Sequence, residues 1–213
     1  MTTGLRGFRI VPNAAVLHFA RHHVSARFEP DPAAPRRSEH LAGRECAALA
    51  LARAGAPRGE VGTNADGSPI WPAGFIGSIT HTRGFASACV SPLGELAGVG
   101  IDTEEVLDGS ASAEIRDAVA TRDELARLRR DTPLDEQSLV TLVFSAKESV
   151  YKCIAPLTKE FLEFHEVELL GVDLAAGAFE ARIQRTLGVP VGRPCGRFQL
   201  EAGLVHTAVE LPI

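Results

Sequence analysis

The order of predicted elements along this 213-residue sequence indicates an α+β protein in which one arrangement occurs twice. An alanine-rich run of good helix formers at 37–54 is followed by three short apolar segments that we expect to be strands. A second helical pattern at 135–155 is followed by alternating segments at 177–184 and 204–211. Element order therefore predicts a pseudo-duplicated fold of two similar lobes, each with a long helix packed on a small antiparallel sheet.

The composition argues against two broad classes of function. The sequence has 22 Lys and Arg against 27 Asp and Glu, a net charge of -5, and no long basic run, so we expect no nucleic-acid partner. No apolar stretch approaches the roughly 20 residues that a membrane helix requires, and polar residues interrupt the N-terminus where a signal peptide needs an apolar core. We expect a cytoplasmic protein without a membrane partner, whose four widely spaced cysteines are buried thiols.

The first lobe is predicted to span residues 1–105. Its first 35 residues are expected to be irregular because prolines interrupt them. The helix over 37–54 ends at Gly55, which cannot continue it without cost. Three strands of one antiparallel meander follow, at 75–80, 85–90 and 96–101.

The second lobe is predicted to span residues 106–213. It begins with a polar, charged segment that suits exposed helices. The helix over 135–155 has one apolar face, drawn by residues three and four apart: Leu139, Val143, Ala146, Val150 and Ile154. Pro156 is expected to end this helix, and Gly203 supplies the hairpin turn before the last strand.

Two carboxylates stand at the end of a predicted strand in the string GVGIDTEE. Side chains alternate along a strand, so Asp102 and Glu104 point to one side, and Thr103 and Glu105 to the other. Two carboxylates on one side repel each other, and a divalent cation between them removes the repulsion. Mg²⁺ is the best match because one or two carboxylates commonly hold it together with phosphates and waters. A polar strand end in water is the alternative.

The helix segment FSAKESVYKCIAP contains two of the only three lysines in the chain, Lys147 and Lys152, on either side of Glu148. Glu148 and Lys152 are four residues apart and share a helix face, as in an ordinary exposed ion pair. The remaining basic residues are almost all arginine. Two lysines so close together favour chemistry that needs an ammonium group, whose protonation burial can tune.

Polar residues of the first lobe supply two weaker signals. Ser78 and His81 lie at the end of a predicted strand in the string GSITH, and a lone histidine is more often structural than a ligand. Arg37 and Arg44 are seven residues apart and lie nearly on one stripe of the first helix, so they could grip a phosphate. A solvated helix face explains these two arginines equally well.

Together these strings resemble the 4′-phosphopantetheinyl transferases that activate siderophore and polyketide synthases, of the enterobactin synthetase component D type. The ordered combination of GSxTH, GxDxE and KExxxK carries the resemblance, which spans most of the chain. The matching strings are RRSEHLAGREC, WPAGFIGSITH, GVGIDTEE, FSAKESVYK, PLTKEFLEF and GLVHTAVEL.

The resemblance implies a single-chain pseudo-dimer that binds coenzyme A between its lobes. The phosphopantetheine arm of coenzyme A would move to a serine of an apo acyl, peptidyl or aryl carrier protein, and adenosine 3′,5′-bisphosphate would leave. A chain that already contains both walls of its cleft needs no second copy, so we expect a monomer.

The resemblance also implies roles for individual residues. Asp102, Glu104 and Glu148 match the family's magnesium ligands, with Mn²⁺ a possible substitute. Glu148 and Lys152 are the expected catalytic residues, Glu148 as the base that takes the serine proton or only as a metal ligand. The expected coenzyme A contacts are Arg37, Arg44, Ser78, His81, Lys147 and Lys152.

Two positions depart from the family pattern. Phe144 stands where many relatives have a tryptophan, and we expect only a mild packing change. Asp66 stands in the loop before the WP pair, where relatives often carry a basic residue, and an acid there would repel a phosphate. We expect either that the loop turns Asp66 outward or that Arg36, Arg37 and Arg58 supply the missing charge.

Two other functions remain compatible with these residues. A magnesium-dependent phosphohydrolase would use the same three carboxylates to activate water instead of a serine. A non-catalytic binder of carrier proteins or nucleotides would keep the fold without the chemistry.

Overall fold

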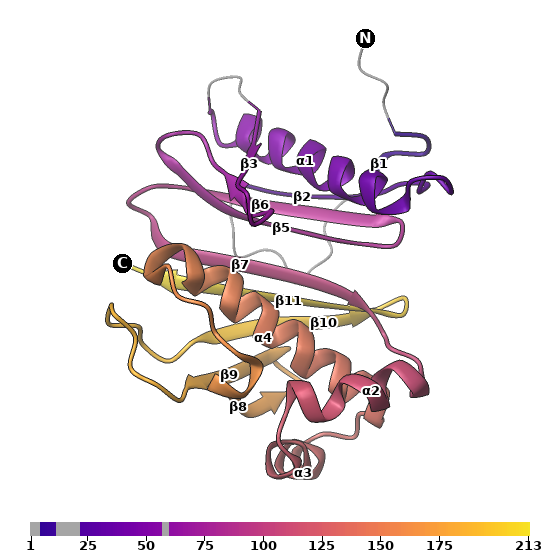
Figure 1. The fold of residues 1–213 in the computed structure, drawn as a ribbon, viewed down its shortest axis with the longest axis vertical. Helices are drawn as coiled ribbons and strands as arrows, with labels where there is room; N and C mark the ends of the chain where they lie inside the picture. Colours follow the sequence, from indigo (N-terminus) through magenta and orange to yellow (C-terminus); the bar gives the residue numbers. More distant parts are fainter. Residues whose placement is uncertain (1–4, 12–21, 57–59) are drawn as a thin grey trace.

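The computed structural model describes residues 5–11, 22–56 and 60–213, and it confirms the predicted α+β class. Two antiparallel sheets lie one above the other along the long axis of the molecule, and one long helix covers the same face of each (Figure 1). We call the upper sheet with its helix lobe 1 and the lower sheet with its helices lobe 2.

Lobe 1 has a four-stranded sheet in the order β1-β2-β6-β5. Its elements are β1 (Arg9–Val11), β2 (His22–Arg27), α1 (Pro35–Arg53), the small hairpin of β3 (Gly62–Thr63) and β4 (Pro69–Ile70), β5 (Phe75–Thr82) and β6 (Phe85–Pro92). The predicted helix and first two strands are confirmed. The expectation of irregular structure over 1–35 is wrong for β1 and β2, because the polar residues His23 and Ser25 conceal the alternation of buried Val24 and Ala26.

Small side chains let α1 lie close to this sheet. Four residues of α1 are fully buried against β2 and β6: Ala42, Cys46, Ala47 and Ala50. The start of α1 therefore reaches the end of β5, where Glu39 lies 3.9 Å from His81. Two of the predicted site elements, the arginine helix and the GSITH strand, are neighbours for this reason.

Lobe 2 has a five-stranded sheet in the order β7-β11-β10-β9-β8. Its elements are β7 (Leu96–Glu105), α2 (Gly109–Val119), α3 (Arg122–Asp131), α4 (Glu136–Thr158), the 3-10 turn η2 (Phe164–Glu166), β8 (Val167–Asp173), β9 (Ala178–Ile183), β10 (Cys195–Glu201) and β11 (Leu204–Pro212). The exposed helices, the long helix and the two predicted strands are confirmed. The sequence pattern missed β8, where a bulge between Leu169 and Gly171 breaks the alternation, and β10.

The expected three-stranded meander is wrong in its third strand. β7 pairs with β11, with Asp102 opposite Thr207 and Glu104 opposite Val205, and not with β5 or β6. The chain changes sheet at the turn between β6 and β7, so a division at residue 105 separates β7 from the sheet to which it is hydrogen-bonded. Short turns predict neighbouring strands, but the partner of β7 lies far along the chain, where local sequence does not reveal it.

The two sheets meet edge to edge at β5 and β7 through side chains. The hydroxyl of Ser78 accepts the N–H of Ile101 at 3.0 Å, and the hydroxyl of Thr80 accepts the N–H of Thr103 at 2.9 Å. Unpaired N–H groups on an edge strand invite association with other chains. The hydroxyls of β5 therefore join the lobes and satisfy two N–H groups on this edge of the lobe 2 sheet.

Helix α4 lies directly on β7 because glycines stand where the two cross. The face of β7 that carries Asp102 also carries Gly98 and Gly100. A β carbon at Gly100 would overlap the carbonyl oxygen of Ser149, and one at Gly98 would lie 2.6 Å from the carbonyl oxygen of Cys153. The two backbones are thus in contact, which brings the polar side of α4 to the acidic end of β7.

The long helix continues past its proline. All five residues of its predicted apolar face are buried. Pro156 does not end α4, which runs to Thr158 and stops where Lys159 adopts a left-handed conformation with φ of 58°. A proline within the last turn removes only one backbone donor, so the helix tolerates it.

Two further expectations concern membrane-spanning helices and the burial of the cysteines. Among the described residues, no helix combines the length and the apolar character needed to cross a membrane. All four cysteines are free; Cys46, Cys89 and Cys153 are buried as expected, whereas Cys195 at the start of β10 is exposed.

A buried histidine joins the lobes on the sheet face opposite the helices. The ring of His206 on β11 packs on Phe85 of β6 with centroids 5.0 Å apart, and its Nδ1 lies 3.0 Å from Oγ1 of Thr103. Burial, and then the charge of Arg27, lower the pKa of His206 to about 4. The ring is therefore neutral in the folded protein at neutral pH.

Gly100→Ala is expected to lower the free energy of unfolding by about 1–3 kcal/mol, because an added methyl group has no room beneath α4. Urea denaturation measures the change. Gly171→Ala on β8 is the control, since a β carbon there meets nothing within 4 Å, and it should shift stability by less than about 0.5 kcal/mol. Equal changes in the free energy of unfolding at both positions would show that α4 does not pack closely on β7.

Acid is expected to destabilise the protein through His206. An unfolded histidine has a pKa of about 6.5, so the unfolded state binds more protons between that pH and the folded pKa of about 4. Stability therefore falls as the pH falls through this window, by up to about 3 kcal/mol. Urea denaturation across the window should show a shallower pH dependence for His206→Asn than for the wild type. Identical pH profiles would contradict the buried, neutral state of this histidine.

Candidate functional site

An ion pair between β7 and α4 lies at the centre of the predicted site. Nζ of Lys152 is 2.6 Å from Oδ1 of Asp102, and their side chains are 28% and 3% exposed. Burial alone would lower the pKa of Lys152, but the carboxylates of Asp102, Glu148 and Glu104 together raise it above its usual value. Lys152 is therefore a cation held among acids.

Glu104 and Glu148 complete an acidic group around this lysine. Burial, and then the negative charge of Asp102, raise the pKa of Glu104 to about 8. Burial also raises the pKa of Glu148, with Lys152 opposing the rise and Asp102 adding to it. The structure thus brings together all four of these sequence-predicted residues, and their charges act on one another. We call Asp102, Glu104 and Glu148 the acidic group.

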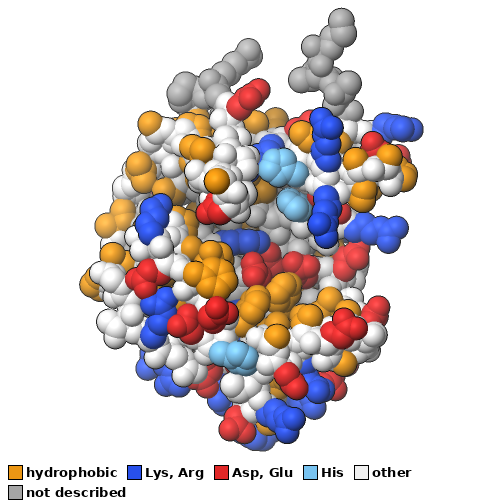
Figure 2. Space-filling view, viewed as in Figure 1, with side chains coloured by type: hydrophobic (Ala, Val, Ile, Leu, Met, Phe, Trp, Pro, Cys, Tyr) orange, Lys and Arg blue, Asp and Glu red, His pale blue; other side chains and the backbone are white. Residues whose placement is uncertain are grey.

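Figure 2 shows acidic side chains gathered across the middle of the face that α1 and α4 cover, at the junction of the lobes. Histidine side chains lie directly above them, on the side of lobe 1, and Lys and Arg side chains lie on either side. Acids and bases are therefore adjacent at this junction. Such an arrangement suits a ligand that carries both a metal ion and phosphate groups.

The acidic group fits Mg²⁺ in chemistry and charge. Carboxylate oxygens are ligands that Mg²⁺ prefers, and Oδ2 of Asp102 is buried without a hydrogen-bond partner among the described residues. A buried oxygen in that state costs free energy unless a ligand uses it. Among the described residues, no three His, Cys, Asp or Glu side chains already form a metal-binding cluster. The fit therefore rests on Oδ2 of Asp102 and on the concentration of negative charge.

The GSITH strand contributes differently from the prediction. Ser78 is 4% exposed and its hydroxyl accepts the N–H of Ile101, so it acts in the junction of the lobes instead of facing a ligand. His81 is more exposed and lies beside Glu39. Burial, and then the positive charge of Lys152, lower the pKa of His81, which places its ring in the electrostatic environment of the acidic group.

The two predicted arginines differ in their surroundings. Arg37 is exposed and has no ion-pair partner in the part of the chain that the structure describes. Nη1 of Arg44 donates to the carbonyl oxygen of Gly62 at 2.6 Å, which ties α1 to the β3–β4 hairpin. Arg37 is therefore available to a ligand, and Arg44 also supports the hairpin. Arg36, a second candidate for the compensating charge, is also exposed, and the third, Arg58, lies outside the described residues.

Asp66 is directed into its own turn. Its Oδ1 accepts the N–H of Ser68 at 2.9 Å and the hydroxyl of Ser68 at 2.6 Å. The hydrogen bonds from Ser68 lower the pKa of Asp66, and the charge of Lys159 adds to this effect. The carboxylate is thus occupied within the β3–β4 hairpin.

Lys147 does not belong to the site, and the expectation that it contacts coenzyme A is wrong. Its side chain is 1% exposed, and its ammonium donates to the carbonyl oxygen of Val119, to Oε2 of Glu124 and to the carbonyl oxygen of Phe164. The other oxygen of Glu124 accepts the N–H of Leu169 at 2.8 Å. Lys147 therefore joins α4 to the elements packed around it, and its three donors are all used.

Aromatic residues next to the acidic group were not predicted as functional. Phe144 and Tyr151 lie four residues before and three after Glu148, on the same side of α4. Phe144 packs on Phe164 and Tyr151 on Phe161, each pair with ring centroids 5.5 Å apart. Phe161 is 65% exposed. The helical spacing of Phe144 and Tyr151 from Glu148 was the available signal for this apolar border.

Two family descriptions match the chain in succession. The first, the 4′-phosphopantetheinyl transferase N-terminal domain, matches residues 31–91, and the second, the 4′-phosphopantetheinyl transferase superfamily, matches residues 98–188. The interval between the two matches contains the turn at which the chain changes sheet.

Several known proteins are similar to this chain. The 4′-phosphopantetheinyl transferase Svp of Streptomyces mobaraensis is 39% identical over 188 residues, which cover 83% of this chain and 73% of that protein. The 4′-phosphopantetheinyl transferase PptT of Mycobacterium tuberculosis is 33% identical over 187 residues, 84% of this chain and 80% of that protein. Enterobactin synthase component D of Escherichia coli (strain K12) is 40% identical over 121 residues, 55% of this chain and 54% of that protein.

Lys147→Met is expected to lower the free energy of unfolding by about 3–5 kcal/mol, because it leaves Glu124 charged and buried without its partner. Adding Glu124→Gln should recover part of the loss. Arg130→Met on the exposed side of α3 is the control and should change stability by less than about 0.5 kcal/mol. Unchanged stability together with weaker coenzyme A binding in Lys147→Met would return this lysine to the site.

Proposed function

The chain belongs to the 4′-phosphopantetheinyl transferase family, and we propose that it moves the 4′-phosphopantetheine arm of coenzyme A to a serine hydroxyl of an apo carrier protein. The serine oxygen forms a bond to the phosphorus that bears the pantetheine arm, the diphosphate bond of coenzyme A breaks, and adenosine 3′,5′-bisphosphate leaves. The serine proton must go to a base. Acyl, peptidyl and aryl carrier proteins are the substrate class.

One observation carries the proposal: the acidic group surrounds the ammonium of Lys152 where the two lobes meet. Lobe 2 supplies these charges from β7 and α4, and lobe 1 supplies the exposed cation Arg37 and the nearby ring of His81. A diphosphate bound together with a divalent cation needs both kinds of charge at one place.

Mg²⁺, or Mn²⁺ in its place, would be held by Asp102, Glu104 and Glu148. Oδ2 of Asp102, which has no hydrogen-bond partner among the residues that the structure describes, is the oxygen best prepared for this role. When bound, the ion would neutralise charge that develops on the diphosphate as the bond breaks.

Lys152 and Glu148 are the residues that act on the reacting groups. The carboxylates around Lys152 keep it protonated, so it donates to the departing phosphate oxygen. Burial raises the pKa of Glu148, which makes it a stronger base toward the serine hydroxyl. Coordination to a metal ion weakens a carboxylate as a base, so the two roles of Glu148 compete.

Residues of lobe 1 bind and orient coenzyme A. Arg37 is exposed on α1 and His81 lies at the end of β5 beside Glu39, and both would bind its phosphates. Arg44 stabilises the binding surface by donating a hydrogen bond to the β3–β4 hairpin. Two hydrogen bonds from Ser68 turn the carboxylate of Asp66 into its own hairpin, so Asp66 is not among the groups that bind the phosphates.

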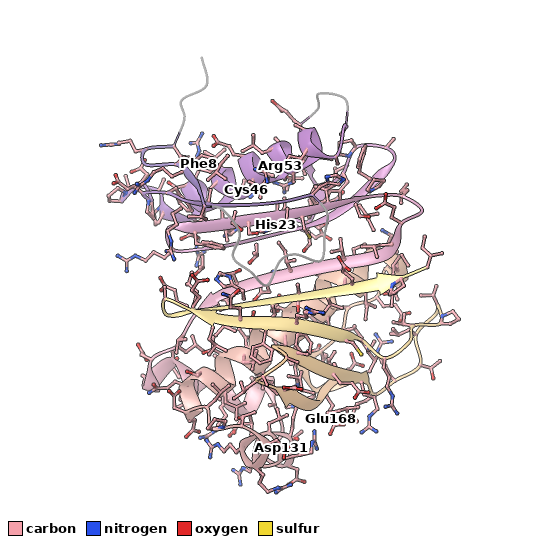
Figure 3. All side chains as sticks on the ribbon, turned by 180° about the vertical axis from the view of Figure 1, so that it is seen from behind. Phe8, His23, Cys46, Arg53, Asp131 and Glu168 are labelled. Atoms are coloured by element: carbon pink, nitrogen blue, oxygen red, sulfur yellow. The ribbon has the colours of Figure 1, made fainter. Side chains whose placement is uncertain are left out.

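Incubation of the protein with coenzyme A, MgCl₂ and an apo carrier protein should raise the mass of the carrier by one phosphopantetheine group. Asp102→Asn should slow this transfer by about 100-fold or more, since it removes one charge from the acidic group. Asp131→Asn is the matched control, because Asp131 lies far from the junction, at the opposite end of lobe 2 (Figure 3). Mass spectrometry of the carrier is the readout.

Other outcomes of the same incubation identify the alternatives. Consumption of coenzyme A without any gain in carrier mass, across several carriers, would indicate a phosphohydrolase. Binding of coenzyme A or carrier without turnover would indicate a non-catalytic binder.

A further inference from the structure

We propose that Thr80 on lobe 1 is a positioning residue for the acidic group of lobe 2: its hydroxyl fixes Asp102 so that one carboxylate oxygen stays free for a metal ion. This inference rests on the proposed function. It assigns a role to a buried strand residue that makes no contact with a substrate in the proposed reaction.

The hydroxyl of Thr80 makes two contacts with the same stretch of β7. Oγ1 accepts the N–H of Thr103 at 2.9 Å, and this N–H belongs to the peptide group that follows Asp102. The hydroxyl proton is directed at Oδ1 of Asp102, at 3.4 Å. Since 3.4 Å is long for such a bond, the peptide contact is the stronger of the two. Thr80 is 3% exposed, so water does not compete for either contact.

These contacts give the two carboxylate oxygens of Asp102 different surroundings. Oδ1 faces Lys152 at 2.6 Å and the hydroxyl of Thr80. Oδ2 is buried and has no partner in the described part of the chain. A carboxylate free to rotate would share these partners between its oxygens. Holding Oδ1 from two sides therefore keeps Oδ2 available, as partners of metal-binding carboxylates commonly do.

The other hydroxyl of the same strand provides a natural comparison. Ser78 also accepts an N–H of β7, that of Ile101 at 3.0 Å, and it is as deeply buried as Thr80. It makes no hydrogen bond to an acidic side chain in the described structure. Loss of Ser78 therefore removes an equivalent link between the lobes without affecting the carboxylate of Asp102.

Binding of Mn²⁺ to the protein without coenzyme A tests this inference, because the electron paramagnetic resonance signal of free Mn²⁺ measures affinity without any turnover. Thr80→Val keeps the shape of the side chain and removes the hydroxyl, and it should weaken Mn²⁺ binding about 10-fold or more. Thr80→Ser keeps the hydroxyl and should bind within about twofold of the wild type. Ser78→Ala should do the same.

Activity and stability provide two further readouts. Thr80→Val should raise the KM for Mg²⁺ by a similar factor and leave the KM for coenzyme A nearly unchanged, which a general loss of structure would not do. Urea denaturation shows whether each variant is folded. Thr80→Ala, which leaves room for a water molecule, replaces Thr80→Val in every comparison if the valine variant does not fold.

Four results would overturn the inference or separate it from the proposed function. Mn²⁺ affinity in the valine or alanine variant equal to that of the wild type would overturn it, as would an equal loss in Ser78→Ala. Wild-type protein that binds no Mn²⁺ would overturn both the inference and the metal site of the proposed function. Wild-type protein that binds Mn²⁺, with the predicted order among the variants, but modifies no carrier would support the inference and overturn the transferase proposal.

Discussion

Repulsion among the three carboxylates at the junction of the lobes is the constraint on which the rest of this structure depends. Burial and the negative charge of Asp102 raise the pKa of Glu104 and of Glu148, and the fold places the ammonium of Lys152 among these carboxylates. The single charge of Lys152 would not balance the three negative charges that the group carries once all its members are ionised. The group is thus prepared for a further cation, and the free energy stored in this repulsion favours binding one.

The fold brings these charges together by bringing two backbones into contact. Gly98 and Gly100 let α4 lie directly on β7, and only this close approach puts Lys152 within 2.6 Å of Asp102. Lobe 1 then completes the site from the other side. Its edge strand β5 joins β7 through the hydroxyls of Ser78 and Thr80, so the position of the acids depends on both lobes.

Local sequence patterns predicted the parts of the site that a single element determines. Alternation along β7 placed Asp102 and Glu104 on one side, and the four-residue spacing placed Glu148 and Lys152 on one helix face. Two aspects required distant parts of the chain. The pairing of β7 with β11 depends on a strand about a hundred residues away. Lys147 points into the core because Glu124, on another helix, forms an ion pair with its ammonium there.

The same distinction applies to lobe 1. The motif GSITH identified the right strand, but it could not separate the buried hydroxyls, which hold the lobes together, from the more exposed His81, on which the charges of Lys152 and Asp102 act. Asp66 was expected to oppose phosphate binding from its charge alone. Its hydrogen bonds to Ser68 decide its orientation, and such a turn is visible only when the backbone of the hairpin is known.

The central claim is that the acidic group and Lys152 together bind a metal ion and the diphosphate of coenzyme A. Anomalous diffraction from crystals grown with MnCl₂ and coenzyme A tests it most directly, because the manganese signal identifies the ion and its ligands. The account predicts one manganese peak bound by Asp102, Glu104, Glu148 and oxygens of the diphosphate, with Lys152 donating to a phosphate oxygen. A peak elsewhere, or coenzyme A bound with no manganese near these carboxylates, would contradict it.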